Sequence, residues 1–163
     1  MTEAKKHIEA TLLLPVTVDK IGLGLKKQKI GAGKLNGWGG VIDPGETPLA
    51  CIVREVCEEG GVMVDPKTLI KAALMLFHNE KFDCTVHVYL APWSYESLQE
   101  TDEMGPLKWY DRLAPPLHNM MPADKVWLPL VLEGYFIRGE AWYGPHQETL
   151  ENCIIDYVDP HDL

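Results

Sequence analysis

Three glutamates stand close together in one stretch of the chain that has helical periodicity. Glu55 lies three and four residues before Glu58 and Glu59, so a helix would place all three carboxylates on one face. Like charges at this spacing repel each other, and such a cluster is either a solvated helix face or a cation site. Oxygen ligands gathered at one place suit Mg²⁺, which binds carboxylates together with waters and substrate phosphates. The spacing indicates a candidate magnesium site, with a solvated acidic surface as the alternative.

Arg54 is the immediate sequence neighbour of the first of these carboxylates. Its planar guanidinium can make two parallel hydrogen bonds to one carboxylate, and Glu46 lies just before the start of the predicted helix. We expect this pair to tie the preceding loop to the helix. The alternative is an exposed surface ion pair, which contributes little to stability.

The segment 40–62 resembles the Nudix box. That pattern reads Gly, five residues, Glu, seven residues, Arg-Glu, an aliphatic residue, any residue, Glu-Glu, any residue, Gly and an aliphatic residue. Every fixed position is present, namely Gly40, Glu46, Arg54, Glu55, Val56, Glu58, Glu59, Gly61 and Val62. Nine constrained positions over 23 residues make this a highly specific signal.

The resemblance implies a catalytic set made of Arg54, Glu55, Glu58 and Glu59. The three glutamates would ligate one or more divalent ions, Mg²⁺ or alternatively Mn²⁺, with a backbone carbonyl of Gly39 or Gly40 completing the shell. The ions would neutralise charge on the bridging oxygens and orient the attacking water for in-line displacement. Which glutamate takes the proton from that water stays open.

Beyond the box, the chain looks like the MutT-homologue branch of this family, which includes a vertebrate enzyme acting on oxidised purine nucleoside triphosphates. The likeness extends from Thr11 to Tyr157 and is strongest at 31–40, 86–88, 102–104, 127–130 and 155–157. It implies that Glu103 is a further acidic group near the metals. The substrate-binding residues that it implies are Thr11, Lys26, Asn36, Trp38, Met75, Met104, Met121 and Asp124.

Some of these residues also have an ordinary structural explanation. An amide offers both donors and acceptors to a base edge, which makes Asn36 the first base-contact candidate, but Asn36-Gly37 is also a common turn pair. Thr11 and Lys26 match positions near the sugar and the phosphates, although a strand threonine and a surface lysine are unremarkable alone. Both interpretations stay open for these residues.

The chain departs from this branch where a tryptophan followed by Pro-Asp-Asp is expected. It has Met121-Pro122-Ala123-Asp124 instead, so one stacking ring and one of two carboxylates are missing. Without an acidic neighbour, Asp124 is expected to stay ionised and to act only as an acceptor. Its alternative role is the N-cap of the helix that follows. Ile30, Met75 and Cys84 stand at further pocket positions and make the pocket softer and less aromatic, which weakens geometric selection of a base.

The function predicted from these residues is Mg²⁺-dependent hydrolysis of a modified, oxidised purine nucleoside triphosphate to the monophosphate and pyrophosphate. Within enzymes, the alternative is a hydrolase for another nucleotide, such as an alkylated purine triphosphate or a nucleotide-sugar. From a different class, the chain could be a catalytically silent module that binds a nucleotide or a protein. The intact acidic cluster argues against silence, because mutually repelling carboxylates have little other reason to stay together.

The elements that must position these residues can be read from periodicity and turn signals. Strands are predicted at 8–18, 21–25, 38–42, 69–77, 84–91, 107–110, 136–143 and 152–158, with a loop at 28–36. A helix is predicted at 48–59, with Thr47 as N-cap, Pro48 at its first position and Gly60-Gly61 as its stop. A second helix is predicted at 124–135, with Pro129 inside it. This order predicts a mixed sheet flanked by helices, an α/β (α+β) fold. The resemblance implies the Nudix-type α/β/α sandwich.

Composition limits what the chain binds. A chain of 163 residues without repeats or linkers is expected to form one domain, 1–163, and nothing in the sequence decides its oligomeric state, for which we expect a monomer. A net charge of −9 offers no broad basic surface, so we expect no nucleic-acid or membrane partner beyond a small nucleotide substrate. The four cysteines lack metal-site spacing, and no signal peptide or membrane span is recognised, so the cytoplasm is the expected location.

Overall fold

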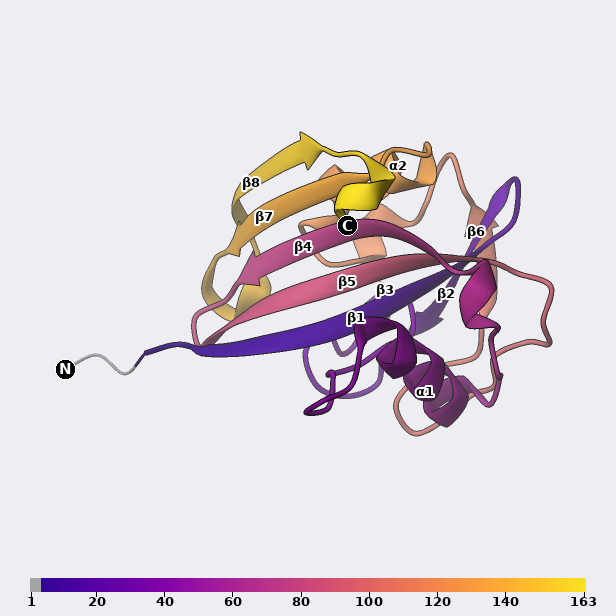
Figure 1. The fold of residues 1–163 in the computed structure, drawn as a ribbon. Coiled ribbons are helices and arrows are strands. Elements are labelled where there is room, and N and C mark those ends of the chain that lie inside the picture. Colours follow the sequence, from indigo (N-terminus) through magenta and orange to yellow (C-terminus); the bar gives the residue numbers. More distant parts are fainter. Residues whose placement is uncertain (1–3) are drawn as a thin grey trace.

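The computed structural model describes residues 4–163, and its elements follow the predicted order. Eight strands and two helices are joined by loops that contain short 3₁₀ turns (Figure 1). The strands are β1 (Lys6–Val16), β2 (Lys20–Leu25), β3 (Leu35–Asn36), β4 (Ile70–His78), β5 (Phe82–Pro92), β6 (Lys108–Asp111), β7 (Ile137–Tyr143) and β8 (Leu150–Tyr157). The helices are α1 (Pro48–Gly60) and α2 (Asp124–Leu132). None of the helices in the described part is long and apolar enough to cross a membrane.

All eight strands belong to one mixed sheet. Its order is β3-β2-β1-β5-β4-β7-β8, and β6 pairs with β2. The pairs β1–β5 and β4–β7 are parallel, whereas the remaining pairs are antiparallel. The sheet is therefore mixed, as the sequence predicted.

The two helices cover opposite faces of the sheet, and a separate hydrophobic core lies under each (Figure 1). Side chains alternate between the faces along each strand, so Leu14 of β1 packs in the core under α2 while Leu13 packs in the core under α1. Both cores include strand residues from β1 and β5. The predicted α/β/α sandwich is confirmed.

Residues 38–42, predicted as a strand, form only two isolated bridges to β1, Leu13 with Trp38 and Ala10 with Val41. The glycines of this segment explain the difference. A Cβ on Gly37 or Gly39 would overlap the backbone of β1, so the segment presses against β1 at close range instead of forming a regular ladder.

Helix α2 ends at Leu132, three residues earlier than the sequence predicted. Gly134 adopts a left-handed conformation with φ 98°, which ends the helix because glycine alone adopts it without strain. The helix begins at Asp124 with Ala123 as the N-cap residue, and no side chain caps it. The alternative role of Asp124 as N-cap was therefore wrong.

Candidate active site

Helix α1 presents the acidic cluster because its ends are fixed locally. The Thr47 side chain accepts a hydrogen bond from the Ala50 amide at 3.1 Å, and Gly61 closes the helix with φ 73°. The face that carries Ile52 and Val56 is buried against the sheet. These caps confirm the predicted helix to within one residue, and the carboxylates lie beside the loop that precedes it.

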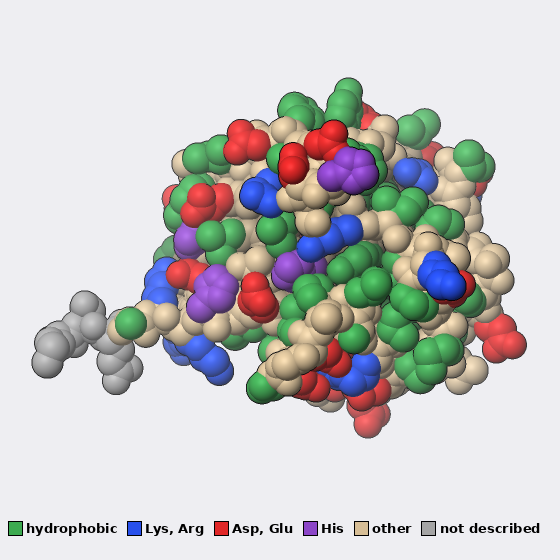
Figure 2. Space-filling view, in the orientation of Figure 1, with side chains coloured by type: hydrophobic (Ala, Val, Ile, Leu, Met, Phe, Trp, Pro, Cys, Tyr) green, Lys and Arg blue, Asp and Glu red, His purple; other side chains and the backbone are tan. Residues whose placement is uncertain are grey.

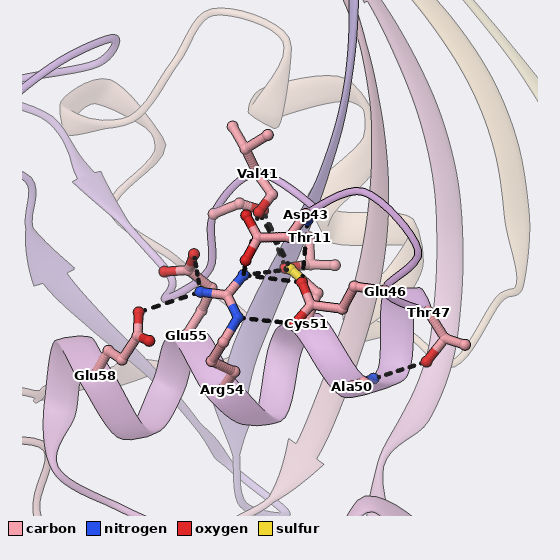
Figure 3. Close-up of polar contacts among 11 residues, drawn as sticks. Thr11, Val41, Asp43, Glu46, Thr47, Ala50, Cys51, Arg54, Glu55 and Glu58 are labelled. Atoms are coloured by element: carbon pink, nitrogen blue, oxygen red, sulfur yellow. Dashed lines mark hydrogen bonds and ion pairs between the residues drawn. The ribbon is translucent and has the colours of Figure 1, made fainter.

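Arg54 is the centre of the polar network at this loop (Figure 3). Its Nε and Nη2 donate to the two oxygens of Glu46 at 2.8 and 2.9 Å, which is the expected bidentate pair. Its Nη1 donates to Glu55 at 2.9 Å and to Glu58 at 3.1 Å, and Nη2 lies 3.4 Å from Asp43. These hydrogen bonds lower the pKa of Glu46 to about 2. Arg54 thus holds the loop and the acidic helix face in one register.

Glu59 lies on the same cluster but in a more buried position. Burial, a hydrogen-bonding contact with Glu55 and the charges of Glu55 and Glu103 raise the pKa of Glu59 to about 8, against a backbone contact with Gly39 that lowers it. The charge of Glu103, from a loop far along the sequence, thus acts on this cluster, and its predicted place near the metals stays a prediction.

The carboxyl group of Glu55 lies directly against Gly40. A Cβ on Gly40 would come within 2.5 Å of the Glu55 carboxyl carbon, so only glycine fits at this position. The Gly40 carbonyl accepts from the Thr11 amide at 2.9 Å and from the Thr11 hydroxyl at 3.3 Å, and the Cys51 thiol lies 3.6 Å away. Among the described residues, no donor bonds the Gly39 carbonyl. Of the two carbonyls, that of Gly39 is the one left free for a ligand.

The donor set of this cluster suits a hard divalent cation. It consists of carboxylate and carbonyl oxygens, which are the ligands that Mg²⁺ and Mn²⁺ take. Within residues 4–163, no three His, Cys, Asp or Glu side chains already converge on a common metal position. Arg54 accounts for this arrangement, because it draws Glu55 and Glu58 toward its guanidinium. Burial and the neighbouring carboxylates Glu55 and Glu103 raise the pKa of Glu59, and a cation bound here would offset the repulsion among these groups.

Lys26, directly after β2, lies within reach of the charges of the acidic cluster. Burial lowers the pKa of Lys26, and the nearby charges of Glu59 and Glu103 act against that shift. A Cβ placed on Gly31 would lie 3.8 Å from Lys26 Cδ and 3.5 Å from Met121 Sδ. Gly31 therefore lies close to both Lys26 and Met121.

Asp124 differs from the expectation of an ionised acceptor. It is only 5% exposed, and its two oxygens accept from the Trp127 Nε1 at 3.0 Å and the Met121 amide at 3.2 Å. Burial raises the pKa of Asp124 to about 7 although both donors lower it. Desolvation therefore raises the pKa of Asp124, as repulsion from a second carboxylate would. With a pKa of about 7, Asp124 changes charge near neutral pH.

The remaining predicted residues fall into two groups. Asn36 is half-buried, and its Oδ1 accepts from the Gly37 amide at 2.8 Å, which leaves its NH₂ group without an acceptor among the described residues. The Thr11 side chain is occupied by Gly40 and by Cys51, 3.3 Å from its thiol. Asn36 thus contacts the segment 37–40 at Gly37, and Thr11 contacts it at Gly40.

Trp38, Met75 and Met104 are buried in the cores, and none is more than 2% exposed. Trp38 and Met104 pack under α1, whereas Met75 packs under α2. Their side chains support the walls of the site in this structure and offer almost no surface to a ligand. Their predicted substrate contacts stay a prediction.

One residue of the network was missed by the sequence reasoning. Cys51 is fully buried, with its sulfur 3.3 Å from the Thr11 hydroxyl and 3.8 Å from Arg54 Nη2. Burial raises the pKa of this thiol to about 11, so it acts as a neutral packing group. Its position four residues before Glu55 on the helix was the available signal.

A surface groove of about 650 Å³ runs along the outer side of α1, next to the acidic cluster. It is lined by Leu49, Val53, Cys57 and Met63, and Arg54 and Glu58 border it. Figure 2 shows hydrophobic side chains gathered on this face, between scattered acidic and basic groups. The groove lacks the buried polar groups found around Asp124 and Glu59.

Comparisons with known proteins agree with this geometry. Residues 9–131 match the family model described as the NUDIX domain. The oxidized purine nucleoside triphosphate hydrolase of Danio rerio is 37% identical over 149 residues, which cover 91% of this chain and 95% of that protein. The protein of the same name from Mus musculus is 35% identical over 153 residues, which cover 91% and 94%.

Solved structures show the same fold. A MutT protein from Bacillus halodurans superposes with a TM-score of 0.71 at 22% identity, covering 91% of this chain and 97% of that one. A MutT hydrolase from Burkholderia pseudomallei gives a TM-score of 0.66 at 22% identity, covering 79% and 98%. The architecture around the acidic helix is therefore shared with these proteins.

Proposed function

The chain belongs to the Nudix hydrolase family, and we propose that it hydrolyses an oxidised purine nucleoside triphosphate to the monophosphate and pyrophosphate. The observation that carries the proposal is that Gly31 lies close both to Lys26, on which the charges of Glu59 and Glu103 act, and to Met121, whose amide donates to Asp124. These contacts connect an acidic cluster with a buried carboxyl group. These two ends correspond to the phosphates and the base of one nucleotide.

Each end has a separate chemical task. At the phosphate end, Glu55, Glu58, Glu59 and the Gly39 carbonyl would hold Mg²⁺ or Mn²⁺, with Glu103 nearby. When bound, the cation neutralises phosphate charge and activates the attacking water. Arg54 keeps the glutamates and the loop in register through Glu46. Lys26 supplies positive charge for phosphate oxygens in a chain of net charge −9.

The base end selects the substrate. Asp124 and the free NH₂ group of Asn36 are the polar groups that can read a base edge, and the Met121 thioether can pack on its ring. The relatives from fish and mouse are named for oxidised purine nucleoside triphosphates, which supports the same substrate class for this chain.

The alternative is a related hydrolase for another nucleotide, such as an alkylated purine triphosphate or a nucleotide-sugar. The observation that favours it is Met121 with Ala123, which replaces a rigid ring and a carboxylate by softer, apolar groups. We also propose a monomeric protein that acts in the cytoplasm on small nucleotides and that needs no macromolecular partner. Gel filtration of the purified chain measures its oligomeric state.

Pyrophosphate release from a panel of oxidised, alkylated and ordinary nucleoside triphosphates tests the proposal. We expect the highest kcat/KM on an oxidised purine triphosphate, with no release after a chelator removes divalent metal and recovery when Mg²⁺ or Mn²⁺ is restored. Nucleotide-sugars in the same panel test the alternative. Hydrolysis that persists in the chelator would contradict the assigned site, and highest activity on a nucleotide-sugar would favour the alternative.

A further inference from the structure

The sulfur of Cys51 lies where strand β1, the segment 37–41 and helix α1 meet (Figure 3). The side chain is fully buried in the first turn of α1. Its sulfur lies 3.3 Å from the Thr11 hydroxyl and 3.6 Å from each of the carbonyl oxygens of Gly40 and Val41. Burial raises the pKa of this thiol to about 11, so it keeps its proton and can donate it to one of these oxygens. Cys51 is thus a hydrogen-bonding group as well as a packing group.

The two carbonyls that the thiol approaches are also held by neighbouring donors. The Thr11 amide and hydroxyl donate to the Gly40 carbonyl at 2.9 and 3.3 Å, and Arg54 Nη2 donates to the Val41 carbonyl at 3.3 Å. Arg54 Nη2 also lies 3.8 Å from the Cys51 sulfur, because the two residues are about one helical turn apart. Cys51 therefore links Thr11 of β1 to Arg54 of α1 through the backbone carbonyls between them.

The direction of these carbonyls decides where the Gly39 carbonyl points. The carbonyls of Trp38 and Gly40 both accept from amides of β1, at 2.6 and 2.9 Å. Successive carbonyls of an extended segment point to opposite sides, so the Gly39 carbonyl between them points away from β1. On the other side, a Cβ on Gly40 would come within 2.5 Å of the Glu55 carboxyl carbon. A shift of the Gly40 carbonyl would therefore change both the direction of the Gly39 carbonyl and the room left for Glu55.

On the basis of the proposed function, we propose that Cys51 is a positioning residue, whose thiol fixes the Gly40 carbonyl and thereby the direction of the Gly39 carbonyl. The thiol itself touches neither substrate nor cation, because the side chain is fully buried. Its effect is to hold a cation ligand in place before the cation binds, so that less ordering is needed on binding. Position 51 is not a fixed position of the Nudix box, so the motif alone assigns no role to Cys51.

The variants Cys51→Ala and Cys51→Ser test this role, because they differ from each other only by a hydroxyl that can donate in place of the thiol. We expect Cys51→Ala to weaken Mn²⁺ binding to the substrate-free protein about fivefold, measured by electron paramagnetic resonance. Its kcat should fall by a similar factor, with less than a twofold change in KM, since the loss of one buried hydrogen bond is of about this size. Cys51→Ser should stay within about twofold of wild type in both assays. The matched control is Cys57→Ala on the same helix, which should leave both values unchanged, because the Cys57 thiol makes no hydrogen bond within residues 4–163.

Hydrogen exchange of the Thr11 amide, which donates to the Gly40 carbonyl, gives a readout that needs neither metal nor substrate. We expect faster exchange of this amide in Cys51→Ala than in Cys51→Ser. A Cys51→Ala protein with a lower melting temperature but the Mn²⁺ affinity of wild type overturns the inference, because the thiol then only packs. Equal losses in both variants overturn it too, because the donor then has no effect.

The proposed function can fail separately from this inference. If wild type binds Mn²⁺ but releases no pyrophosphate from any nucleotide, the proposed function fails, while Mn²⁺ affinity and amide exchange still decide the role of Cys51. A wild-type protein that binds no Mn²⁺ contradicts both.

Discussion

Two carboxyl groups on opposite sides of the sheet have pKa values that are shifted in opposite directions. Under α1, Arg54 donates to both oxygens of Glu46 and lowers the pKa of that carboxyl to about 2. Under α2, Asp124 has only neutral N–H donors, and burial raises its pKa to about 7. Charge compensation keeps the first group ionised at every physiological pH, whereas desolvation lets the second titrate. Ion pairing therefore sets the pKa of Glu46, whereas burial is the main cause of the raised pKa of Asp124, as it is for Glu59 in the acidic cluster.

The largest effect is expected from the phosphate end. Glu59→Gln removes a charge and a cation ligand, so kcat should fall about a hundredfold or more on every substrate alike. The protein should stay folded, because the change relieves a buried carboxylate that lies against Glu55. Steady-state pyrophosphate release on at least two substrates measures this. The exposed Glu133→Gln is the matched control, and a Glu59→Gln enzyme of normal rate would falsify the assigned role.

The titration of Asp124 should appear in the pH dependence of the free energy of unfolding. The folded chain binds the Asp124 proton more tightly than the unfolded chain does, because its pKa rises from 3.8 to about 7. The free energy of unfolding should therefore decrease as the pH rises from about 4 to about 7, by on the order of 2–4 kcal/mol from this group. Asp124→Asn should remove that part of the slope.

Urea unfolding at several pH values across this window measures the slope. The comparison that matters is between wild type and Asp124→Asn, since other groups contribute equally to both. Asp156→Asn, at an exposed position on β8, is the control and should retain the wild-type slope. Parallel curves for wild type and Asp124→Asn would mean that Asp124 is not the buried titrating group.

The smallest effect is expected from the pocket wall. Met121→Trp adds a rigid ring next to Gly31, and the preference for oxidised guanine over dGTP should rise by up to about tenfold, mainly in kcat/KM. Ala123→Asp is a poor companion change, because Ala123 is fully buried and a second carboxyl group there would destabilise the core. A wild-type enzyme already strongly selective for oxidised guanine, with no gain from the ring, would show that stacking at this position is dispensable.

Residues close in sequence determined the acidic helix α1 by themselves. The helix α1, its caps at Thr47 and Gly61, and the pairing of Arg54 with Glu46 were all predicted, and the structure confirms them. These features depend on spacing within about twenty residues, and helix geometry converts such spacing directly into a shared face. The mixed sheet was also predicted, because strand and helix periodicities differ clearly along the chain.

Close backbone approach was not visible in the sequence. The segment 38–42 has strand composition, yet Gly37 and Gly39 let it press on β1 without forming a ladder. Helix α2 also ends early, because Gly134 adopts a left-handed conformation. The apolar residues around Gly134 have helical spacing, so the sequence predicted a longer helix. Periodicity reports which side chains can be buried but not how near two backbones come.

The sequence by itself determined that the protein carries a Nudix cluster and where its glutamates stand, because those residues occupy one helix. Only the tertiary structure decided the protonation behaviour of Asp124. Asp124 was expected to be ionised for lack of an acidic neighbour, but its pKa depends on desolvation by residues from other elements. Burial and long-range proximity are properties of the packed chain, and no local spacing encodes them.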